Sequence, residues 1–347
     1  MTDPTAAGTV PDRQRRIVLR RRPEGLVTWD DVELIDDAEV PTLEDGHALV
    51  RHELLSMDAT VRSWMNDSDG YLPAVELGEV VRCSGIGTVV ATRSPAFAVG
   101  DVAYSLGGMQ EYTTVTDDIF TTRLEPGTEM APMLSIYGAT GLTAYVGTVD
   151  VGQVKEGETF VVSAAAGATG SLAGQIAKIR GARVVGIAGS DEKCRFVVDE
   201  LGFDACINHR TDDLRAALKE HCPKRVDVFF DNVGGRVLDA VLGRLAFGGR
   251  VVLCGAISSY NEPTKPPGPA NYLNLIQQRG RMEGFIAFDH WGRFTEIMDV
   301  LRGWVDSGEL RHVEHAYEGL ESSIDALNAL FTGENTGKVI VSVRPQA

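Results

Sequence analysis

The sequence predicts an α/β protein in two parts: a doubly wound parallel sheet and a smaller, mainly β unit. The chain has 347 residues, of which 44% are hydrophobic, and this length suits about two domains with apolar cores. Short β-rich runs broken by Gly, Pro and Asp fill residues 15–125, whereas strand-like and helix-like runs alternate over residues 158–290. Apolar strands that alternate with helices favour parallel pairing with both faces of the sheet covered.

The elements of both parts follow from apolar periodicity and from turn residues. In the first part, four short runs are typical of strands in an irregular, barrel-like β unit: residues 48–53, 87–92, 101–104 and 111–115. In the second part, five apolar runs predict strands: residues 158–163, 182–188, 205–208, 226–231 and 249–254. Amphipathic stretches predict helices at residues 171–180, 191–201 and 292–307. A sixth apolar run, 282–288, is expected at the edge of the parallel sheet, and a last strand, 338–343, is expected to return to the first unit.

The charge balance and the cysteines exclude several classes of function. The chain carries 49 acidic and 33 basic residues, a net charge of −16, which disfavours nucleic acid and anionic membranes as partners. No stretch approaches the roughly 18 apolar residues needed to cross a bilayer. The first 16 residues contain no apolar core of a secretory signal, so we expect none. The five cysteines are scattered, odd in number and without Cys-x-x-Cys spacing, a pattern typical of reduced thiols in the cytoplasm.

A glycine-rich loop joins the first strand of the second part to its first helix. The loop Ala165-Ala166-Gly167-Ala168-Thr169-Gly170 matches the dinucleotide-binding pattern G-x-G-x-x-G, with Ala165 in the first glycine place. Small residues let backbone amides approach a pyrophosphate, and the helix N-terminus adds partial positive charge. A tight turn in an unrelated α/β protein is the alternative. The position between a strand and a helix, at the head of five strand-like units, favours dinucleotide binding.

The end of the second strand indicates which dinucleotide the loop would bind. Proteins that use the cofactor without a 2′-phosphate place Asp or Glu there, where the carboxylate bonds the ribose hydroxyls. Here Gly189 and Ser190 follow the strand, and Asp191 is explained as part of a helix start. Ser190, Lys193 and Arg210 supply a hydroxyl and two cations, a set suited to a phosphate dianion. The alternative is that these are ordinary surface charges.

Several segments of the sequence resemble one family. They are Leu55-Ser56-Met57-Asp58 with Arg62, Gln110-Glu111-Tyr112, Gly141-Leu142-Thr143-Ala144-Tyr145, Gly189-Ser190-Asp191-Glu192-Lys193, Phe230-Asp231-Asn232-Val233-Gly234-Gly235, Tyr260-Asn261 and Gly333-Glu334-Asn335. On these segments the chain resembles the zinc-independent medium-chain dehydrogenase/reductases, and within them the NADP-dependent alkenal and prostaglandin reductases and the bacterial curcumin reductases. The resemblance extends from about Arg16 to the C-terminus.

The resemblance implies a fold and an activity. The fold is a Rossmann doubly wound parallel sheet plus a GroES-like, mainly β substrate domain. The GroES-like catalytic domain would cover residues 1–133, with 315–347 returning to it, and the NADP-binding Rossmann domain would cover 134–314. The implied activity is the metal-free, NADPH-dependent reduction of the C=C bond of α,β-unsaturated aldehydes and ketones. The expected partners are NADP(H), an enal or enone substrate and a second copy in a homodimer, without nucleic acid or membrane.

The resemblance also implies the roles of site residues. Those expected to meet the pyrophosphate are Gly167, Ala168, Thr169 and Gly170. Lys193 and His209 are expected to meet the adenosine 2′-phosphate, next to Ser190 and Arg210, which the residues alone already suggest; His209 stands where the group usually has tyrosine. Those expected to line the nicotinamide and ribose are Asn232, Cys254, Ala256, Ile257, Ser258 and Tyr260. Phe285, Ile286 and Ala287 would flank the nicotinamide, and Asn335 would reach it from the C-terminal segment.

No metal is expected at this site. Zinc-binding relatives use Cys, His and a carboxylate as ligands. Ser56, Met57 and Asp58 stand where a ligand cysteine would be expected, and the histidines form no ligand pair in the motif positions.

Without a metal, a hydrogen-bond donor must stabilise the enolate that develops on the substrate oxygen. Tyr260 follows the fifth strand of the second part, on the carboxyl side where open α/β sheets bind ligands, and the resemblance gives it the same role. The alternative is that Tyr260 only packs against the ribose or closes the loop. Two other functions also stay open: an NADPH:quinone reductase of the same fold, and a non-catalytic NADP-binding regulatory protein.

Overall fold

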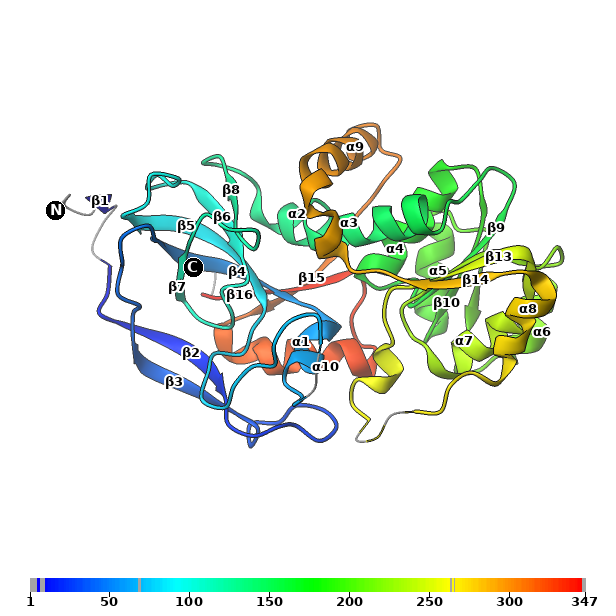
Figure 1. Ribbon diagram of the computed structural model, residues 1–347, viewed down its shortest axis with the longest axis horizontal. Coiled ribbons are helices and arrows are strands. Elements are labelled where there is room, and N and C mark those ends of the chain that lie inside the picture. Colours follow the sequence, from blue (N-terminus) through cyan, green and yellow to red (C-terminus); the bar gives the residue numbers. More distant parts are fainter. Residues whose placement is uncertain (1–4, 7–9, 68–69, 263, 265, 345–347) are drawn as a thin grey trace. The chain divides into compact units, whose positions relative to one another are not determined.

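The computed structural model describes residues 5–6, 10–67, 70–262, 264 and 266–344, and it divides into two compact units (Figure 1). The first, here called the β-rich unit, comprises Met1–Leu134, Glu314–Glu334 and Val339–Ala347. The second, here called the α/β unit, comprises Ser135–Val313 and Asn335–Lys338. A mainly β unit beside a separate unit built on a parallel sheet confirms the predicted fold class.

The β-rich unit contains an eight-stranded sheet with the order β15-β16-β4-β5-β6-β8, in which β1 also pairs with β5 and β7 with β4. Its strands are β1 (Thr5–Ala6), β4 (Ala48–Met57), β5 (Ser84–Thr92), β6 (Val102–Ser105), β7 (Tyr112–Val115), β8 (Thr122–Leu124), β15 (Glu314–Glu318) and β16 (Lys338–Ser342). A separate hairpin pairs β2 (Arg13–Leu19) with β3 (Val32–Glu39). The helices are α1 (Ala59–Trp64), α2 (Met130–Ser135), α10 (Ser323–Thr332) and a 3₁₀ helix, Leu320–Ser322.

The last strand of the chain belongs to the β-rich sheet. β16 pairs antiparallel with β4, with Val339 opposite Met57. These two side chains and that of Leu55 are buried in one apolar cluster with residues of α10. Burial of so many aliphatic side chains is the dominant stabilising term for such a unit, at about 25 cal/mol per Å² of apolar surface.

The α/β unit is built on a six-stranded sheet with the order β11-β10-β9-β12-β13-β14, and its neighbouring strands are parallel. The strands are β9 (Thr159–Ser163), β10 (Arg183–Ala188), β11 (Ala205–Asn208), β12 (Val226–Asp231), β13 (Leu245–Leu253) and β14 (Arg281–Gly284). The α-helices are α3 (Ala139–Tyr145), α4 (Ala168–Ile179), α5 (Asp191–Asp199), α6 (Leu214–His221), α7 (Gly235–Leu242), α8 (Asn274–Gln278) and α9 (Phe294–Asp306). A π-helix covers Val146–Val151, and 3₁₀ helices cover Ile257–Ser259, Ala270–Leu273 and Ala287–Arg293.

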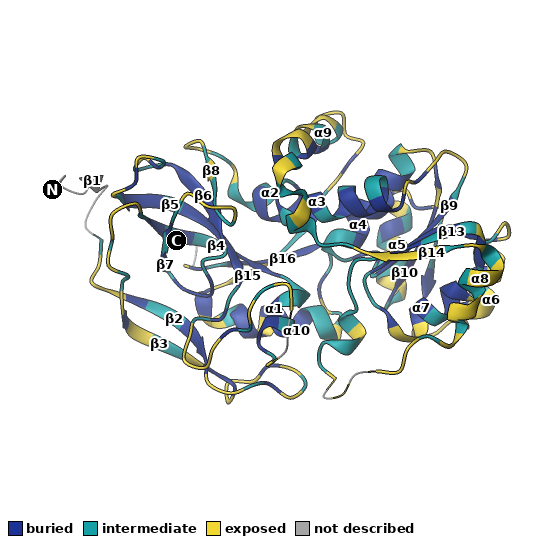
Figure 2. Ribbon diagram, viewed as in Figure 1, coloured by how far each residue is buried: buried dark blue, intermediate teal, exposed yellow. Residues whose placement is uncertain are grey.

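The strand order reverses at β9, because the chain runs from β9 to β10 and β11 on one side and then returns to β12 on the other. Both faces of this sheet are covered, as Figures 1 and 2 show. Leu218 of α6 and Val241 of α7 share a buried cluster with Val161 of β9, while the neighbours Phe160 and Val162 are buried on the opposite side of the strand. In open α/β sheets, ligands bind outside the carboxyl ends of the strands at such a reversal.

Several details differ from the expectations from sequence. β4 continues to Met57, beyond the predicted end at 53, and β5 begins at Ser84, before the predicted start at 87. β13 begins at Leu245, before the predicted start at 249, and β14 covers Arg281–Gly284 in place of 282–288 because the chain enters a 3₁₀ helix at Ala287. Asn335–Lys338 groups with the α/β unit, although 315–347 was assigned to the β-rich one. The loop after β13 includes residues 263 and 265, which lie outside the described residues.

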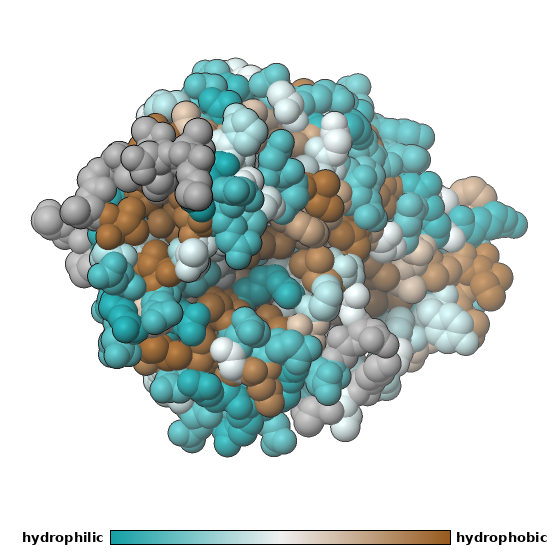
Figure 3. Space-filling model, turned by 60° about the vertical axis from the view of Figure 1, so that its left-hand side comes forward, coloured by the Kyte–Doolittle hydropathy of each residue, from teal (hydrophilic) through white to brown (hydrophobic). Residues whose placement is uncertain are grey.

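Among the described residues, no helix is long and apolar enough to cross a bilayer. Hydrophilic and hydrophobic side chains are interspersed on the face of the molecule that Figure 3 draws. β14 is an edge strand of the parallel sheet, and it is exposed along its whole length (Figure 2).

Candidate active site

The glycine-rich loop connects β9 to α4 by a tight turn. Ala164 adopts a left-handed conformation with φ of 50°, which costs a residue with a Cβ about 1–2 kcal/mol. A Cβ added at Gly170 would lie 2.3 Å from the carbonyl oxygen of Ala164, so only glycine fits there. The amide of Ala165 donates to the Ile187 carbonyl at 3.1 Å, and Ala165 is buried. The loop therefore brings its backbone to the N-terminus of α4, where an anion is favoured.

A segment from near the C-terminus supports this loop. The amide of Gly337 donates to the Ala166 carbonyl at 2.8 Å, and Asn335 Nδ2 donates to the Gly337 carbonyl at 3.2 Å. Gly337 has a φ of 71°, and a Cβ there would lie 2.1 Å from the Val313 carbonyl oxygen. Asn335, which was predicted to reach the nicotinamide, is buried where it makes this hydrogen bond to Gly337.

The side chains of His209 and Arg210 lie beside Gly189 at the end of β10. A Cβ added at Gly189 would lie 3.3 Å from His209 Nε2 and 3.5 Å from Arg210 Nε. Burial, followed by the charge of Arg210, lowers the pKa of Lys193. Ser190 caps α5, since its Oγ accepts the amide of Lys193 at 3.2 Å. The predicted residues Ser190, Lys193, His209 and Arg210 therefore follow the carboxyl ends of β10 and β11, and this group of side chains is called the basic pocket below.

Arg236 is a further cation of the basic pocket, and the sequence analysis missed it. Its guanidinium donates to the carbonyl oxygen of His209. Burial, followed by the charges of Arg236 and Arg210, lowers the pKa of His209. Asn208 Nδ2 donates a hydrogen bond to Asp191 Oδ1 at 2.7 Å, which holds this carboxylate away from the basic pocket. The only signal for Arg236 was its place just after the glycines that open α7.

A buried polar network fixes the loop after β12. Ser163 Oγ donates to Asp231 Oδ1 at 2.8 Å, and the amide of Asn232 donates to Ser163 Oγ at 2.8 Å. Asn232 Nδ2 donates to the Ser163 carbonyl at 2.7 Å. Asp231 also accepts the amide of Gly234 at 3.0 Å, and burial raises the pKa of its carboxyl group. Ser163 and Asp231 were not predicted, and they act by holding Asn232 in place.

The loop after β13 is bonded to the loop after β12. The amide of Cys254 donates to the Asp231 carbonyl at 2.9 Å, and that of Ile257 donates to the Asn232 carbonyl at 3.1 Å. Ser258 Oγ donates to the Val233 carbonyl at 2.6 Å. Burial, with a smaller effect of the Asp231 charge, raises the pKa of Cys254 to about 12. The predicted residues Asn232, Cys254, Ile257 and Ser258 therefore lie together at the carboxyl ends of β12 and β13.

Tyr260 closes the same loop. Its hydroxyl oxygen accepts the amide of Ala256 at 3.0 Å, and a Cβ at Gly255 would lie 3.1 Å from that oxygen. A phenol can accept one hydrogen bond and donate another at the same time. The structure therefore assigns Tyr260 a loop-closing contact, and its catalytic role stays a prediction.

Phe285 packs inside the α/β unit. Its ring meets that of Phe230 edge-on, with 6.5 Å between centroids. A Cβ at Gly147, in the π-helix, would lie 2.8 Å from the tip of the Phe285 ring. Ile286 and Ala287 follow it and are half-buried. This packing fixes the start of the segment predicted to flank the nicotinamide.

Most of the chain matches known oxidoreductases. Residues 15–122 match the family model described as the N-terminal domain of oxidoreductase, and residues 168–302 match the one described as zinc-binding dehydrogenase. The NADPH-dependent curcumin reductase of Escherichia coli (strain K12) is 38% identical over 341 residues, which cover 97% of this chain and 99% of that protein. The chain belongs to the medium-chain dehydrogenase/reductase family.

Two other relatives of this medium-chain reductase are informative. The NADP(+)-dependent 2-alkenal reductase of Nicotiana tabacum is 36% identical over 335 residues, which cover 95% of this chain and 97% of that protein. The crystal structure of CurA from Vibrio vulnificus in complex with NADPH has a TM-score of 0.90 and 38% identity, and covers 96% of this chain and 100% of that one. The comparisons confirm the predicted family, and these relatives are named for the predicted cofactor and reaction class.

The description of one matched family model mentions zinc binding. In the part of the chain that the structure describes, no three His, Cys, Asp or Glu side chains are arranged to hold a metal ion. Where a ligand cysteine was expected in zinc-binding relatives, Ser56 Oγ donates to Asp58 Oδ2 at 2.5 Å. Nothing among these residues fits the ligand set of a known zinc site.

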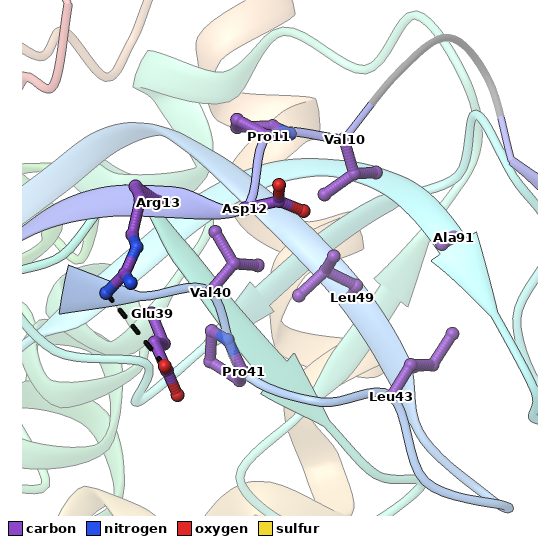
Figure 4. Close-up of a pocket in the computed structure, with 10 residues that line it drawn as sticks. All are labelled: Val10, Pro11, Asp12, Arg13, Glu39, Val40, Pro41, Leu43, Leu49 and Ala91. Carbon is purple, nitrogen blue, oxygen red and sulfur yellow. Dashed lines mark ion pairs between the residues drawn. The ribbon is translucent and has the colours of Figure 1, made fainter. Parts of the chain in front are cut away.

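A pocket of the medium-chain reductase lies in the β-rich unit (Figure 4). Its volume is about 520 Å³, and Val10, Val40 and Leu49 are among its apolar lining residues. Arg13 and Glu39 form an ion pair of 3.9 Å at this pocket, and both side chains are largely exposed. It contains none of the predicted site residues.

Proposed function

We propose that this medium-chain reductase uses NADPH to reduce the C=C bond of α,β-unsaturated aldehydes and ketones. Hydride would go to the β-carbon, and the enolate would then be protonated. Relatives of this reaction class cover almost the whole chain. The observation in the chain itself that carries the proposal is the basic pocket around Gly189, because it supplies cations where an acid would reject a 2′-phosphate.

Different residues of the α/β unit would bind different parts of the cofactor. Lys193, His209 and Arg210 would bind the 2′-phosphate, with Ser190 and Arg236 holding the pocket together. The backbone of Gly167, Ala168, Thr169 and Gly170 would receive the pyrophosphate, since a Cβ at Gly170 would clash with the Ala164 carbonyl. Those proposed for the ribose and nicotinamide are Asn232, Cys254, Ala256, Ile257, Ser258, Phe285, Ile286, Ala287 and Asn335. When bound, NADPH supplies the hydride.

Tyr260 is proposed as the catalytic hydrogen-bond donor. As negative charge develops on the carbonyl oxygen of the substrate, a phenol O–H aimed at it would stabilise the enolate. The amide of Ala256 donates to the Tyr260 oxygen, and this bond holds the hydroxyl in a fixed position. Tyr260 therefore combines a fixed position with the ability to donate.

Turnover with three classes of acceptor tests this function. We would follow NADPH oxidation with a trans-2-enal, an enone and a quinone, and use NADPH deuterated at the transferable hydrogen to locate the label. Reduction of the enal and enone with deuterium on the β-carbon supports the proposal. Turnover of the quinone alone would favour the quinone reductase alternative, and tight NADPH binding without turnover of any acceptor would favour a regulatory protein.

We also propose a homodimer formed through the α/β unit. β14 has a neighbour on one side only in the sheet order, and an exposed edge favours pairing with another strand. Near it, Phe247 is 69% exposed and Ile276 74% exposed, which is unusual for such large apolar side chains. A second copy related by two-fold symmetry would cover the edge and these side chains together.

Light scattering tests this assembly. The unmodified chain should have twice its mass of 37.4 kDa, and Ile276→Glu should reduce it to the single-chain value. Ile119→Glu is the matched control, because Ile119 is equally exposed, at 69%, but lies in the β-rich unit. A single-chain mass for the unmodified protein at every concentration would rule the dimer out.

Two broader assignments are also part of the proposal. Residues 134–314 would serve as the NADP-binding domain, and residues 1–133 with 315–347 as the GroES-like, substrate-recognising domain. The site residues proposed above for the cofactor all fall in the α/β unit. The cytoplasm is proposed as the location, because all five cysteines are free and reduced thiols are typical there.

A further inference from the structure

A buried carboxylate lies at the carboxyl end of β12. Asp231 is fully buried. Its side chain accepts hydrogen bonds from neutral donors, namely Ser163 Oγ at 2.8 Å and the amides of Val233 and Gly234 at 3.0 Å. Burial raises the pKa of Asp231, and no cationic side chain in the described part of the chain acts against that effect. A buried charge is costly unless it is paired, so stability alone does not explain why this residue is an acid.

The hydrogen bonds indicate that the Asp231 side chain is ionised. Oδ1 accepts three hydrogen bonds and Oδ2 accepts one. Ser163 Oγ itself accepts the amide of Asn232 at 2.8 Å, so its own hydrogen is available to Asp231. An ionised carboxylate only accepts hydrogen bonds, whereas a protonated acid must also donate one. A set of four donors around the side chain therefore suits the charged form.

This charge lies next to the segments proposed for the nicotinamide. Asn232 follows Asp231 directly, and the carbonyl oxygen of Asp231 accepts the amides of Cys254 at 2.9 Å and Gly255 at 3.1 Å. The charge of Asp231 adds to the effect of burial on the pKa of Cys254, so its field reaches the loop after β13. Electrostatic interactions extend over several ångströms in a protein interior, where the effective dielectric constant is low. A positively charged ring held by these two loops would lie in the field of the carboxylate.

We propose that the buried carboxylate of Asp231 stabilises the positive charge of the oxidised nicotinamide ring and thereby favours hydride transfer from NADPH. The inference rests on the proposed function, because it requires Asn232 and Cys254 to line the nicotinamide. The hydride carries two electrons to the substrate, so the ring is neutral before transfer and positive after it. A fixed negative charge therefore stabilises the transition state and the oxidised cofactor more than NADPH.

The alternative is that Asp231 only shapes the turn before α7. Asp and Asn side chains both accept backbone amides in such turns, as Asp231 does from Val233 and Gly234. A residue that only shaped the turn would affect the binding of both oxidation states of the cofactor equally. A charge distinguishes the two states, so the ratio of their Kd values separates the two roles.

Calorimetric titration of the full chain with NADP⁺ and with NADPH measures this ratio. Asp231→Asn removes the charge and keeps nearly the same size and one acceptor oxygen. At an effective dielectric constant of about 20, charges about 10 Å apart interact strongly enough to change an equilibrium about tenfold. We therefore expect the Kd of NADP⁺, divided by that of NADPH, to rise about tenfold. If Asp231→Asn does not fold, Asp231→Ser removes the same charge and is tested for the same change.

Asp227→Asn is the matched control. Asp227 lies in the same strand, and its Oδ2 also accepts a backbone amide, that of Thr159 at 2.8 Å. It stands near the amino end of β12, away from the two loops, so its variant should leave the ratio unchanged. The proposal is overturned if loss of the Asp231 charge weakens NADP⁺ and NADPH binding equally, or if Asp227→Asn changes the ratio as much.

Enone turnover separates this inference from the proposed function. An unmodified protein that reduces no enone, together with a raised ratio in Asp231→Asn, would contradict the proposed function and support the role of Asp231 in cofactor binding. Enone reduction by the unmodified protein, together with an unchanged ratio in the variant, would overturn the role of Asp231 alone.

Discussion

Replacing Gly189 by aspartate should reverse the preference between the two nicotinamide dinucleotides. A side chain at this position points between His209 Nε2 and Arg210 Nε, at 3.3 and 3.5 Å from its Cβ. The new carboxylate would pair with the Arg210 guanidinium, occupy the volume of the 2′-phosphate and accept the ribose hydroxyls of NADH. Each charge-assisted hydrogen bond lost costs about 1.5–3 kcal/mol. One lost contact therefore raises the Kd of NADPH about tenfold to hundredfold.

Fluorescence titration with NADPH and NADH measures this effect, and Gly189→Asn is the matched control. Asparagine has nearly the size of aspartate and crowds His209 to the same degree, but it carries no charge. We expect the aspartate variant to bind NADPH more weakly and NADH more tightly than the unmodified protein. The asparagine variant should show much smaller changes in both affinities. If the two variants weaken NADPH equally, crowding and not charge explains the result, and the assignment of the basic pocket to the 2′-phosphate fails.

Three other changes have defined outcomes. Lys193→Met should raise the Kd of NADPH about tenfold or more and leave NADH nearly unchanged, since it removes one charged contact; an equal loss for both cofactors would show that Lys193 only supports the fold. Tyr260→Phe should lower kcat on an enone about a hundred- to a thousandfold with little change in the Kd of NADPH, and full kcat would withdraw its catalytic role. His52 is fully buried, and burial lowers its pKa to about 4. The unfolded pKa is about 6.5, so the stability from neutral His52 is complete above that pH and falls by about 3 kcal/mol as the pH drops toward 4. In urea titrations, the free energy of unfolding of His52→Gln should change less with pH across this range than that of the unmodified protein. An equal change with pH in both proteins would contradict this role of His52.

Local patterns predicted much of the parallel sheet. β11 and β12 begin and end at the predicted residues, because polar or turn residues bound short apolar runs there. β13 was predicted too short, since Gly248 and Gly249 interrupt the strand from Leu245 to Leu253 and glycine weakens a strand pattern. The exposed strand β14 was predicted too long, because Phe285 and Ile286 continue an apolar run after pairing has stopped.

Candidate site residues could be proposed from the sequence where they stand in short motifs. The glycine-rich loop lies between β9 and α4, and Lys193 lies in the first turn of α5, while their roles stay predictions. Arg236 and Ser163 have no such motif. Arg236 reaches the backbone of a residue 27 positions away, and Ser163 bonds a carboxylate 68 positions away. Only the order of the strands in the sheet brings these partners together. Apolar periodicity in the sequence does not predict which polar side chains on different strands meet.

The bond between Gly337 and the Ala166 carbonyl has a consequence for how the protein is made. The loop, β9 and α4 leave the ribosome well before their support, because Gly337 follows the last strand of the parallel sheet in the chain. A nascent or proteolysed chain ending before Gly337 would retain every strand of the parallel sheet and lack that support. Because a ligand stabilises only the form that binds it, cellular NADPH would preferentially protect chains that include Gly337 and leave shorter ones open to degradation.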